Sequence, residues 1–339
     1  MKKAFGTLPN GQQATLYTIS AGGITARVTD YGATLVSLLV PDKEGNVADV
    51  VLGYDDVNAY ATSEGYLGST VGRNCNRVGN ASFPIGEKVY HMTPNEGPHN
   101  LHSGPSGYSH RLWELEYHRD NAVSFRLESP HMDQGFPGNA VIRVTYSIDS
   151  LLHQLNITYD AVSDRETVMN LTNHSYFNLA GHQNTSLAMD QELILPARHF
   201  TPDDAENIPT GEKRPVDGTP MDFRAPKAIG RDIDLEYDAL RLQGGYDHNY
   251  EVFTSPCAVL RDPTSGRTMQ VHTDRPGIQF YSGNYLNNPG KEGVFYPKRS
   301  GVCLETQYYP DSLNKPDWEK PILLANTPMH STTSFRFLY

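Results

Sequence analysis

Two stretches of the sequence place histidines among side chains that form hydrogen bonds. The first runs from Asn170 to Leu179 (NLTNHSYFNL) and surrounds His174 with amides and aromatic rings. Amide and imidazole groups both donate and accept hydrogen bonds, as recognition of a ligand with many hydroxyl groups requires. His174 can also exchange a proton near neutral pH. A binding site and a hydrogen-bonded core histidine explain this stretch equally well.

The second stretch, Asn95 to Gly104, contains His99 and His102. Their spacing on a strand or loop does not direct both rings to one metal ion, and a metal site usually needs a third ligand. We therefore expect no metal. His102, which stands between a leucine and a flexible Ser-Gly pair, is expected to point inward. His99 is expected to lie in an ordinary surface loop.

Three further segments supply charged groups. Glu305 directly follows an apolar run, and burial there would raise the pKa of its carboxyl group toward that of a base near neutrality. A surface glutamate on an edge strand is the alternative. Asp247, in GGYDHNY, could accept hydrogen bonds from sugar hydroxyls, although Asp and Gly also form turns. Arg77, in GRNCNRVG, could donate to hydroxyls or form a structural salt bridge.

Short β-type runs that could position these groups recur along the chain. Ile142, Val144, Tyr146 and Ile148 alternate with polar residues, the period of two of a half-buried strand, and the run from Gln154 to Ala161 predicts its hairpin partner. Other predicted strands are Ile24–Val28, Thr34–Val40, Val89–Met92, Ala122–Leu127, Glu166–Met169, Glu192–Leu195, Ala258–Arg261, Met269–Thr273 and Gly277–Tyr281.

Turn residues separate these runs, and the chain contains 29 Gly and 23 Pro. Long segments with helical periodicity are missing. Many short strands without helices between them predict an all-β, antiparallel sandwich. We expect one domain over residues 1–339, in which the turn-rich stretch 196–231 runs over the surface of a sheet.

Composition narrows the function further. With 28 Lys and Arg against 39 Asp and Glu, the formal charge of −11 argues against a nucleic-acid partner. The 3 cysteines are too few for a disulfide framework. No apolar run reaches the about 20 residues of a membrane span, and the first residues do not resemble a secretory signal, so a cytoplasmic location is expected. The patterns GxSxG and GxxxxGK[ST] are absent.

Taken together and in this order, the polar segments resemble the aldose 1-epimerase (galactose mutarotase) family over essentially the whole chain. The run NLTNHSYFNLAG is close to the family signature, and GRNCNRVG, NLHSG, GGYDHNY, GIQFYSGN and LETQYYPDS fall at the expected places around it. The resemblance implies a large galactose mutarotase-like β-sandwich with few short helices. Its one departure is Ser103, where the family usually has glycine, and only a local adjustment of the loop is expected.

The resemblance also implies roles. Glu305 would take the proton from the anomeric hydroxyl of a free hexose such as galactose or glucose, His174 would protonate the ring oxygen, and His102 would bind the sugar and assist there. The residues that match the hydroxyl-binding positions are Asn76, Arg77, Asp247 and Gln279. Neither a metal nor a cofactor is implied, and a monomer or homodimer is expected.

Three alternatives remain at this point. Epimerisation of a phosphorylated hexose would need more basic residues than Arg73 and Arg77, the one close basic pair in these segments. A non-catalytic sugar-binding module could dispense with Glu305 or His174, yet both are present. A glycoside hydrolase could use Asp247 and Glu305 as its carboxylate pair, but a protonating histidine fits that chemistry poorly.

Overall fold

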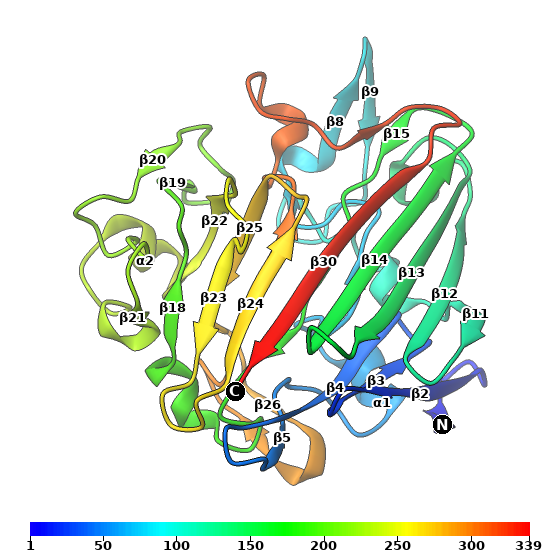
Figure 1. The fold of residues 1–339 in the computed structure, drawn as a ribbon. Coiled ribbons are helices and arrows are strands. Elements are labelled where there is room, and N and C mark those ends of the chain that lie inside the picture. The colour runs from blue at the N-terminus through cyan, green and yellow to red at the C-terminus, as the bar shows by residue number, and fades with distance from the viewer.

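Two large antiparallel sheets pack against each other in the computed structural model, which describes residues 1–339 (Figure 1). The larger sheet contains, in spatial order, β11 (Glu114–His118), β12 (Ala122–Ser129), β13 (Ala140–Asp149), β14 (Gln154–Ser163), β30 (Met329–Leu338), β24 (Thr268–Thr273), β23 (Ala258–Arg261), β18 (Glu192–Ile194) and β21 (Lys227–Ala228). The second contains β17 (Tyr176–Phe177), β28 (Val302–Gln307), β25 (Gly277–Tyr281), β22 (Asp247–Glu251), β19 (His199–Thr201) and β20 (Arg214–Pro215).

Smaller elements complete the fold. A five-stranded sheet near the N-terminus contains β1 (Lys2–Thr7), β2 (Gln13–Ala21), β3 (Ile24–Thr29), β4 (Thr34–Pro41) and β5 (Val47–Asp49). Two-stranded pairs are β6 (Thr70–Val71) with β16 (Thr172–Asn173), β7 (Arg77–Val78) with β10 (Asn100–Leu101), β8 (Ser82–Ile85) with β9 (Lys88–His91), β15 (Thr167–Val168) with β29 (Ile322–Leu323), and β26 (Asn288–Pro289) with β27 (Phe295–Tyr296). The two α-helices, α1 (Val57–Thr62) and α2 (Asp238–Gln243), are short. The predicted all-β sandwich with few short helices is confirmed.

The predicted hairpin is confirmed as β13 and β14. Ile148 pairs with Leu155, and buried residues alternate with half-buried ones along both strands. This alternation directs one face of each strand into the core between the two large sheets. The rings of Phe177 and Phe335, 4.9 Å apart, join the two sheets across that core.

The same alternation aims two polar side chains away from the core. On β25 and β28, Ile278 and Leu304 belong to the core cluster, so their neighbours Gln279 and Glu305 point to the opposite face of the sheet. Gln279 and Glu305 are directly paired across the two strands, which places their side chains next to each other. Backbone pairing thus fixes one edge of a polar site.

The stretch 196–231 differs from the prediction. It does not simply run over a sheet, because β19 and β20 extend the second sheet and β21 adds an edge strand to the first. Strands of two or three residues are too short to show a period of two, so the sequence pattern could not reveal them.

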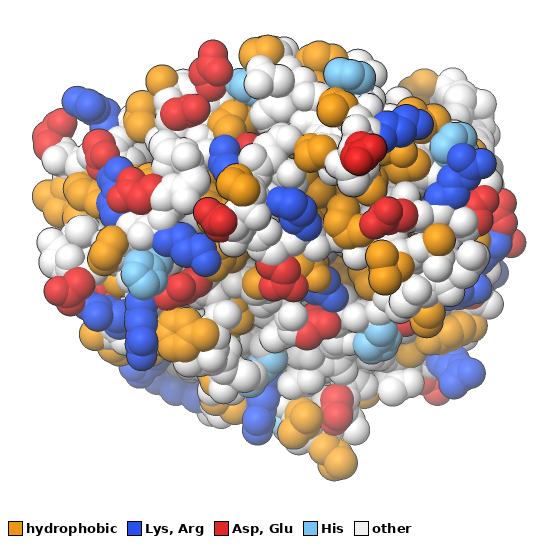
Figure 2. All heavy atoms as spheres, turned by 90° about the horizontal axis from the view of Figure 1, so that it is seen from above, with side chains coloured by type: hydrophobic (Ala, Val, Ile, Leu, Met, Phe, Trp, Pro, Cys, Tyr) orange, Lys and Arg blue, Asp and Glu red, His pale blue; other side chains and the backbone are white.

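Charged side chains are distributed over the surface. Figure 2 shows Lys and Arg interspersed with Asp and Glu on the face of the molecule that it presents. Neither α-helix has the length and apolar character needed to cross a membrane.

Candidate active site

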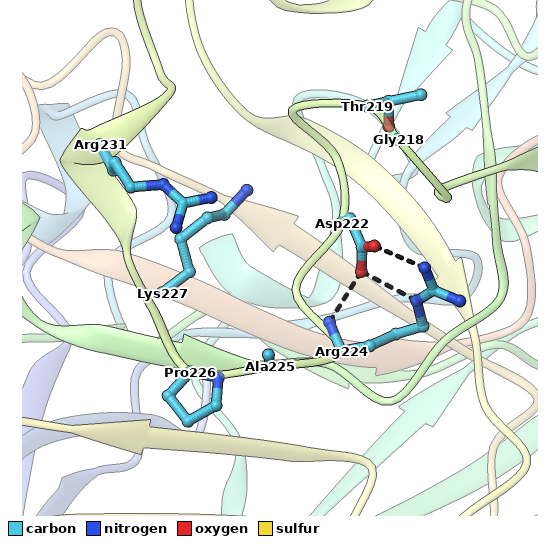
Figure 3. Close-up of a pocket in the computed structure, with 8 residues that line it drawn as sticks. All are labelled: Gly218, Thr219, Asp222, Arg224, Ala225, Pro226, Lys227 and Arg231. Atoms are coloured by element: carbon cyan, nitrogen blue, oxygen red, sulfur yellow. Dashed lines mark hydrogen bonds and ion pairs between the residues drawn. The ribbon is translucent and has the colours of Figure 1, made fainter.

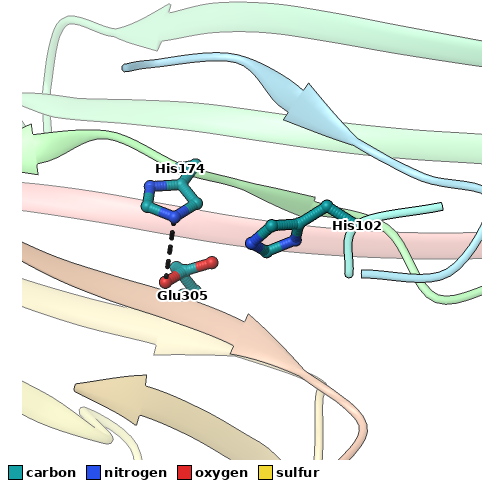
Figure 4. A group of neighbouring side chains, drawn as sticks. All are labelled: His102, His174 and Glu305. Carbon is teal, nitrogen blue, oxygen red and sulfur yellow. Dashed lines mark ion pairs between the residues drawn. The ribbon is translucent and has the colours of Figure 1, made fainter. Parts of the chain in front are cut away.

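Three buried side chains from distant parts of the sequence converge at one place (Figure 4). His102, His174 and Glu305 each offer a nitrogen or oxygen atom within 4.8 Å of the others. Nε2 of His174 lies 3.7 Å from Oε1 of Glu305. The side chains of this pair are only 7% and 3% exposed, so any proton that moves between them or through a ligand does so away from bulk water.

Each member is held by local backbone structure. Glu305 lies within β28 and is paired with Gln279 on the neighbouring strand β25. His174 directly follows β16, and its backbone N–H donates to the carbonyl oxygen of Ser69 at 2.9 Å while its own carbonyl accepts from Gly68 at 2.8 Å. His102 follows β10 with a positive φ of 53°, which turns the chain sharply and directs its ring inward, as predicted.

The backbone also fixes which nitrogen of His102 carries the proton. The N–H of Asn76 donates to Nδ1 of His102 at 3.1 Å, so the neutral ring keeps its hydrogen on Nε2. Burial lowers the pKa of His102 well below its ordinary value of 6.5, and the nearby His174 adds to this effect. His102 is therefore a neutral N–H donor at this site. A nitrogen that carries a hydrogen has no lone pair for a metal ion, so this cluster does not fit a metal centre.

His174 has a different environment. Its Nδ1 lies 3.5 Å from Sγ of Cys303, whose pKa is raised well above the usual value because the thiol is buried. The thiol therefore stays protonated and can donate to Nδ1, which leaves the hydrogen of the neutral ring on Nε2, facing Glu305. Burial lowers the pKa of His174 to about 4.

The carboxyl group of Glu305 shifts in the opposite direction. Burial raises its pKa well above the usual 4.5, the charge of Asp247 raises it further, and Arg77 partly opposes both effects. Oε2 of Glu305 has no hydrogen-bond partner. The raised pKa predicted from the apolar run before Glu305 is thus present, and the alternative of an exposed edge-strand glutamate is wrong.

Groups suited to hydroxyls lie beside this cluster. Nε2 of Gln279 donates to Oδ1 of Asp247 at 2.8 Å, and Arg77 lies 3.8 Å from the other oxygen of Asp247. Oε1 of Gln279 has no partner. Asn76 is also buried here, but its Oδ1 accepts from the N–H of Arg77, so part of its role is to hold the local backbone. All seven predicted site residues therefore belong to one connected region.

Sequence reasoning missed two carboxylates. Glu96 binds Arg77 through both oxygens, at 2.6 and 2.9 Å, so the salt bridge offered as an alternative role for Arg77 is present alongside its contact with Asp247. Asp203 accepts from Nε2 of Gln243 at 2.9 Å, and burial raises the pKa of its carboxyl group well above the usual value. No motif marks Asp203, whereas Glu96 stands in one of the polar segments.

Two expectations about neighbouring residues need correction. His99 does not lie in an exposed loop: it is 4% exposed, and its Nδ1 accepts from the N–H of Asn80 at 3.0 Å. Arg73 does not form a basic pair with Arg77. It is completely buried and donates to backbone carbonyls, including that of Pro137 at 2.9 Å. The hydrogen-bond acceptors of this buried arginine are carbonyl oxygens far away in the sequence, so no local sequence pattern reveals them.

Comparison with known proteins identifies the family of this chain. The family model described as Aldose 1-epimerase matches residues 15–336. The galactose mutarotase of Mus musculus is 38% identical, with 99% of this chain and 98% of that protein covered. The aldose 1-epimerase of Haemophilus influenzae is 36% identical, with 97% of each covered.

Solved structures show the same fold. An aldose epimerase homologue from C. elegans superposes with a TM-score of 0.89 at 31% identity, covering 96% of this chain and 98% of that one. The galactose 1-epimerase of Lactobacillus acidophilus gives a TM-score of 0.86 at 25% identity, covering 100% and 98%. This chain belongs to the aldose 1-epimerase family and is an isomerase that acts on carbohydrates.

Proposed function

We propose that this enzyme interconverts the α and β anomers of free, neutral hexoses such as D-galactose and D-glucose. Glu305 is the general base and His174 is the general acid. The observation that carries this assignment is the buried pair itself, in which Nε2 of His174 faces Oε1 of Glu305 at 3.7 Å beside groups suited to hydroxyls. Relatives whose printed names are galactose mutarotase support the substrate class.

The reaction needs two proton transfers. Glu305 accepts the proton of the C1 hydroxyl, His174 delivers a proton to the ring oxygen, and the bond between C1 and the ring oxygen breaks. The resulting aldehyde rotates about the C1–C2 bond, and the same steps in reverse close the ring on its other face. Each proton transfer by a positioned side chain typically contributes about 10²- to 10⁴-fold.

The pKa directions suit this cycle. In the reactive form of the pair, with the cyclic sugar bound, the shared proton lies on His174 and Glu305 is ionised. Ring opening leaves Glu305 protonated and His174 neutral. Burial disfavours both charges, because it raises the pKa of Glu305 and lowers that of His174 to about 4. The dry site therefore favours the uncharged pair that accompanies the open-chain aldehyde and helps to offset the cost of opening the ring.

The remaining groups hold the sugar while its aldehyde end turns. Arg77, Asp247, Gln279 and Asn76 bind the other hydroxyls, and the N–H of His102 supports the ring oxygen. These steps require neither a metal nor a redox cofactor. We further propose a role in hexose and galactose metabolism, a cytoplasmic location, a single domain over residues 1–339, and a monomer or homodimer.

Polarimetry tests the proposal. Freshly dissolved α-D-galactose and α-D-glucose should approach their final rotation faster with the purified protein, and addition of EDTA should leave the rate unchanged. The ratio of the two rates gives the preferred sugar. If neither sugar is accelerated, the assignment to these hexoses is wrong, and pentoses become the next substrates to test.

Anionic sugars are expected to be poor substrates. Arg77 is surrounded by Glu96, Asp203 and Asp247, so a phosphate or carboxylate on the sugar would meet net negative charge. Because like charges cost several kcal/mol in a buried site, kcat/KM for D-glucose 6-phosphate should be at least about 10²-fold lower than for D-glucose. Polarimetry on both sugars at equal ionic strength measures this, and comparable values would contradict the expectation.

A surface pocket elsewhere on the molecule also contains basic side chains. A surface pocket of about 530 Å³ is lined by Arg224, Lys227 and Arg231 (Figure 3). Three carboxylates balance these three cations: Arg224 contacts Asp222 at 2.6 Å and also pairs with Asp217, and Asp232 accepts from Lys227 at 3.0 Å and from Arg231 at 2.9 Å. The pocket therefore offers no uncompensated positive charge to a phosphate.

A further inference from the structure

Tyr66 packs against both histidines of the catalytic cluster. Its ring centroid lies 4.6 Å from that of His102 and 5.9 Å from that of His174, with the latter pair stacked at 27°. It also contacts His110 at 5.7 Å. The side chain of Tyr66 is half-buried, whereas both histidines are buried, so this ring stands between them and solvent.

The backbone at Tyr66 is strained. Its φ is 57°, a left-handed conformation that a bulky side chain rarely adopts. Such conformations cost of the order of 1–3 kcal/mol and persist where the surrounding structure imposes them. Here the flanking Gly65 and Gly68 also have positive φ values, of 110° and 68°, so the whole turn is bent to bring the ring inward.

This turn is attached to His174 itself. Gly68 donates to the carbonyl oxygen of His174 at 2.8 Å, and the N–H of His174 donates to Ser69 at 2.9 Å. The carbonyl of Tyr66 in turn accepts from Ser69 at 2.9 Å. The turn that carries the Tyr66 ring is thus joined by backbone hydrogen bonds to both the N–H and the carbonyl group of His174.

We propose that Tyr66 is a positioning residue that holds the imidazole of His174 toward Glu305 and keeps water away from it, an assignment that rests on the proposed function. The ring is sufficient for this role, because it acts by packing and exclusion of water. Without it, the imidazole would gain solvent on the face that Tyr66 now covers.

The charged and titratable groups around His174 determine how loss of the Tyr66 ring would change its pKa. They are Glu305 and Cys303 on β28, His102 after β10, Tyr176 on β17, Tyr281 on β25, and His110 behind Tyr66. Burial is the main reason that the pKa of His174 falls to about 4. Hydration after loss of the ring would therefore move this pKa upward, toward its ordinary value of 6.5.

The test compares Tyr66→Ala with Tyr66→Phe. Tyr66→Ala should lower kcat by about 10- to 100-fold, the typical cost of misplacing a catalytic group, and should move to higher pH the limb of the kcat/KM profile that follows the titration of His174. Tyr66→Phe should keep kcat within about 3-fold of the wild type and leave the profile in place, because the ring remains. Thermal unfolding of both variants establishes that they are folded.

Two outcomes would overturn the proposal: an unchanged kcat and pH profile in Tyr66→Ala, or an equal loss in Tyr66→Phe, which would assign the role to the hydroxyl group. Both presuppose that the wild-type protein accelerates mutarotation. An inactive wild type would instead contradict the proposed function, so the two failures are distinguishable.

Discussion

Replacing Glu305 with Gln is expected to reduce turnover of D-galactose by about 10²- to 10⁴-fold, the usual contribution of a positioned base. Gln has nearly the same shape and can still form hydrogen bonds, so the sugar should bind with little change in affinity. The amide cannot accept the proton of the C1 hydroxyl. Polarimetric kcat together with calorimetric sugar binding separates these two effects.

The same substitution should increase stability in a pH-dependent way. The pKa of Glu305 is raised by burial in the folded chain, so ionisation of the unfolded chain above the usual value of 4.5 penalises the folded state. This penalty grows until the pH exceeds the folded pKa and is absent below 4.5. Since Gln carries no charge, the melting temperature of Glu305→Gln should exceed that of the wild type near neutral pH, and the difference should shrink on acidification.

Glu251→Gln provides a matched control. Glu251 is a half-buried carboxylate on β22 that pairs with His199 at 2.9 Å and does not contact the catalytic cluster. This variant should keep wild-type turnover. Near wild-type turnover in Glu305→Gln would remove Glu305 from the role of base, and an equal loss in both variants would point to a general structural effect.

The parts of the fold that could be predicted from sequence are those with a local signal. Strands such as β13 and β14 alternate buried and half-buried residues over ten positions, so both their existence and their pairing follow from the pattern. The polar segments around His174 and Glu305 are also contiguous in sequence. Their resemblance to a known family therefore predicted which residues meet in space.

Features that depend on distant partners could not be predicted. Arg73 and Arg77 stand in one short segment, yet Arg73 donates to backbone carbonyls whereas Arg77 binds carboxylates. His99 is buried because the fold brings the backbone N–H of Asn80 to its ring. The position of the proton on His102 likewise depends on the backbone N–H of Asn76. No sequence motif marks Tyr66, because its packing against His174 depends on a turn that is hydrogen-bonded to the backbone of His174.

Replacement of Arg77 is expected to lower the free energy of unfolding more than any other substitution proposed above. Arg77 is the cation nearest to Glu96 and Asp247 and also interacts favourably with Asp203. Arg77→Met would leave these carboxylates without a cation, and removing one partner of a buried ion pair typically costs about 3–5 kcal/mol in the free energy of unfolding near neutral pH. Loss of its hydrogen bonds to the sugar should also lower kcat/KM by about 10- to 100-fold.

The pH dependence of this loss identifies its cause. Arg77 lowers the pKa of Asp247 and of Glu305 against the effect of burial, so its removal raises both values further. The added cost of folding is then present at neutral pH and disappears as the pH falls and the carboxyl groups are protonated. Chemical denaturation of Arg77→Met at several pH values should show a destabilisation that shrinks toward acid, whereas a constant value would indicate lost packing.

Two variants separate charge from geometry. Arg77→Lys keeps the positive charge but loses the two-pronged contact with Glu96, so it should cost only about 1 kcal/mol while kcat/KM still falls. Arg111→Met removes a comparable two-pronged contact, with Asp133 at 2.7 Å, outside the site. Because Arg111 balances one carboxylate and touches no sugar, its loss should leave turnover unchanged. Arg77→Met and Arg111→Met should therefore differ in both the free energy of unfolding and kcat/KM. These differences measure what the interaction of one arginine with several carboxylates contributes to folding and to sugar binding.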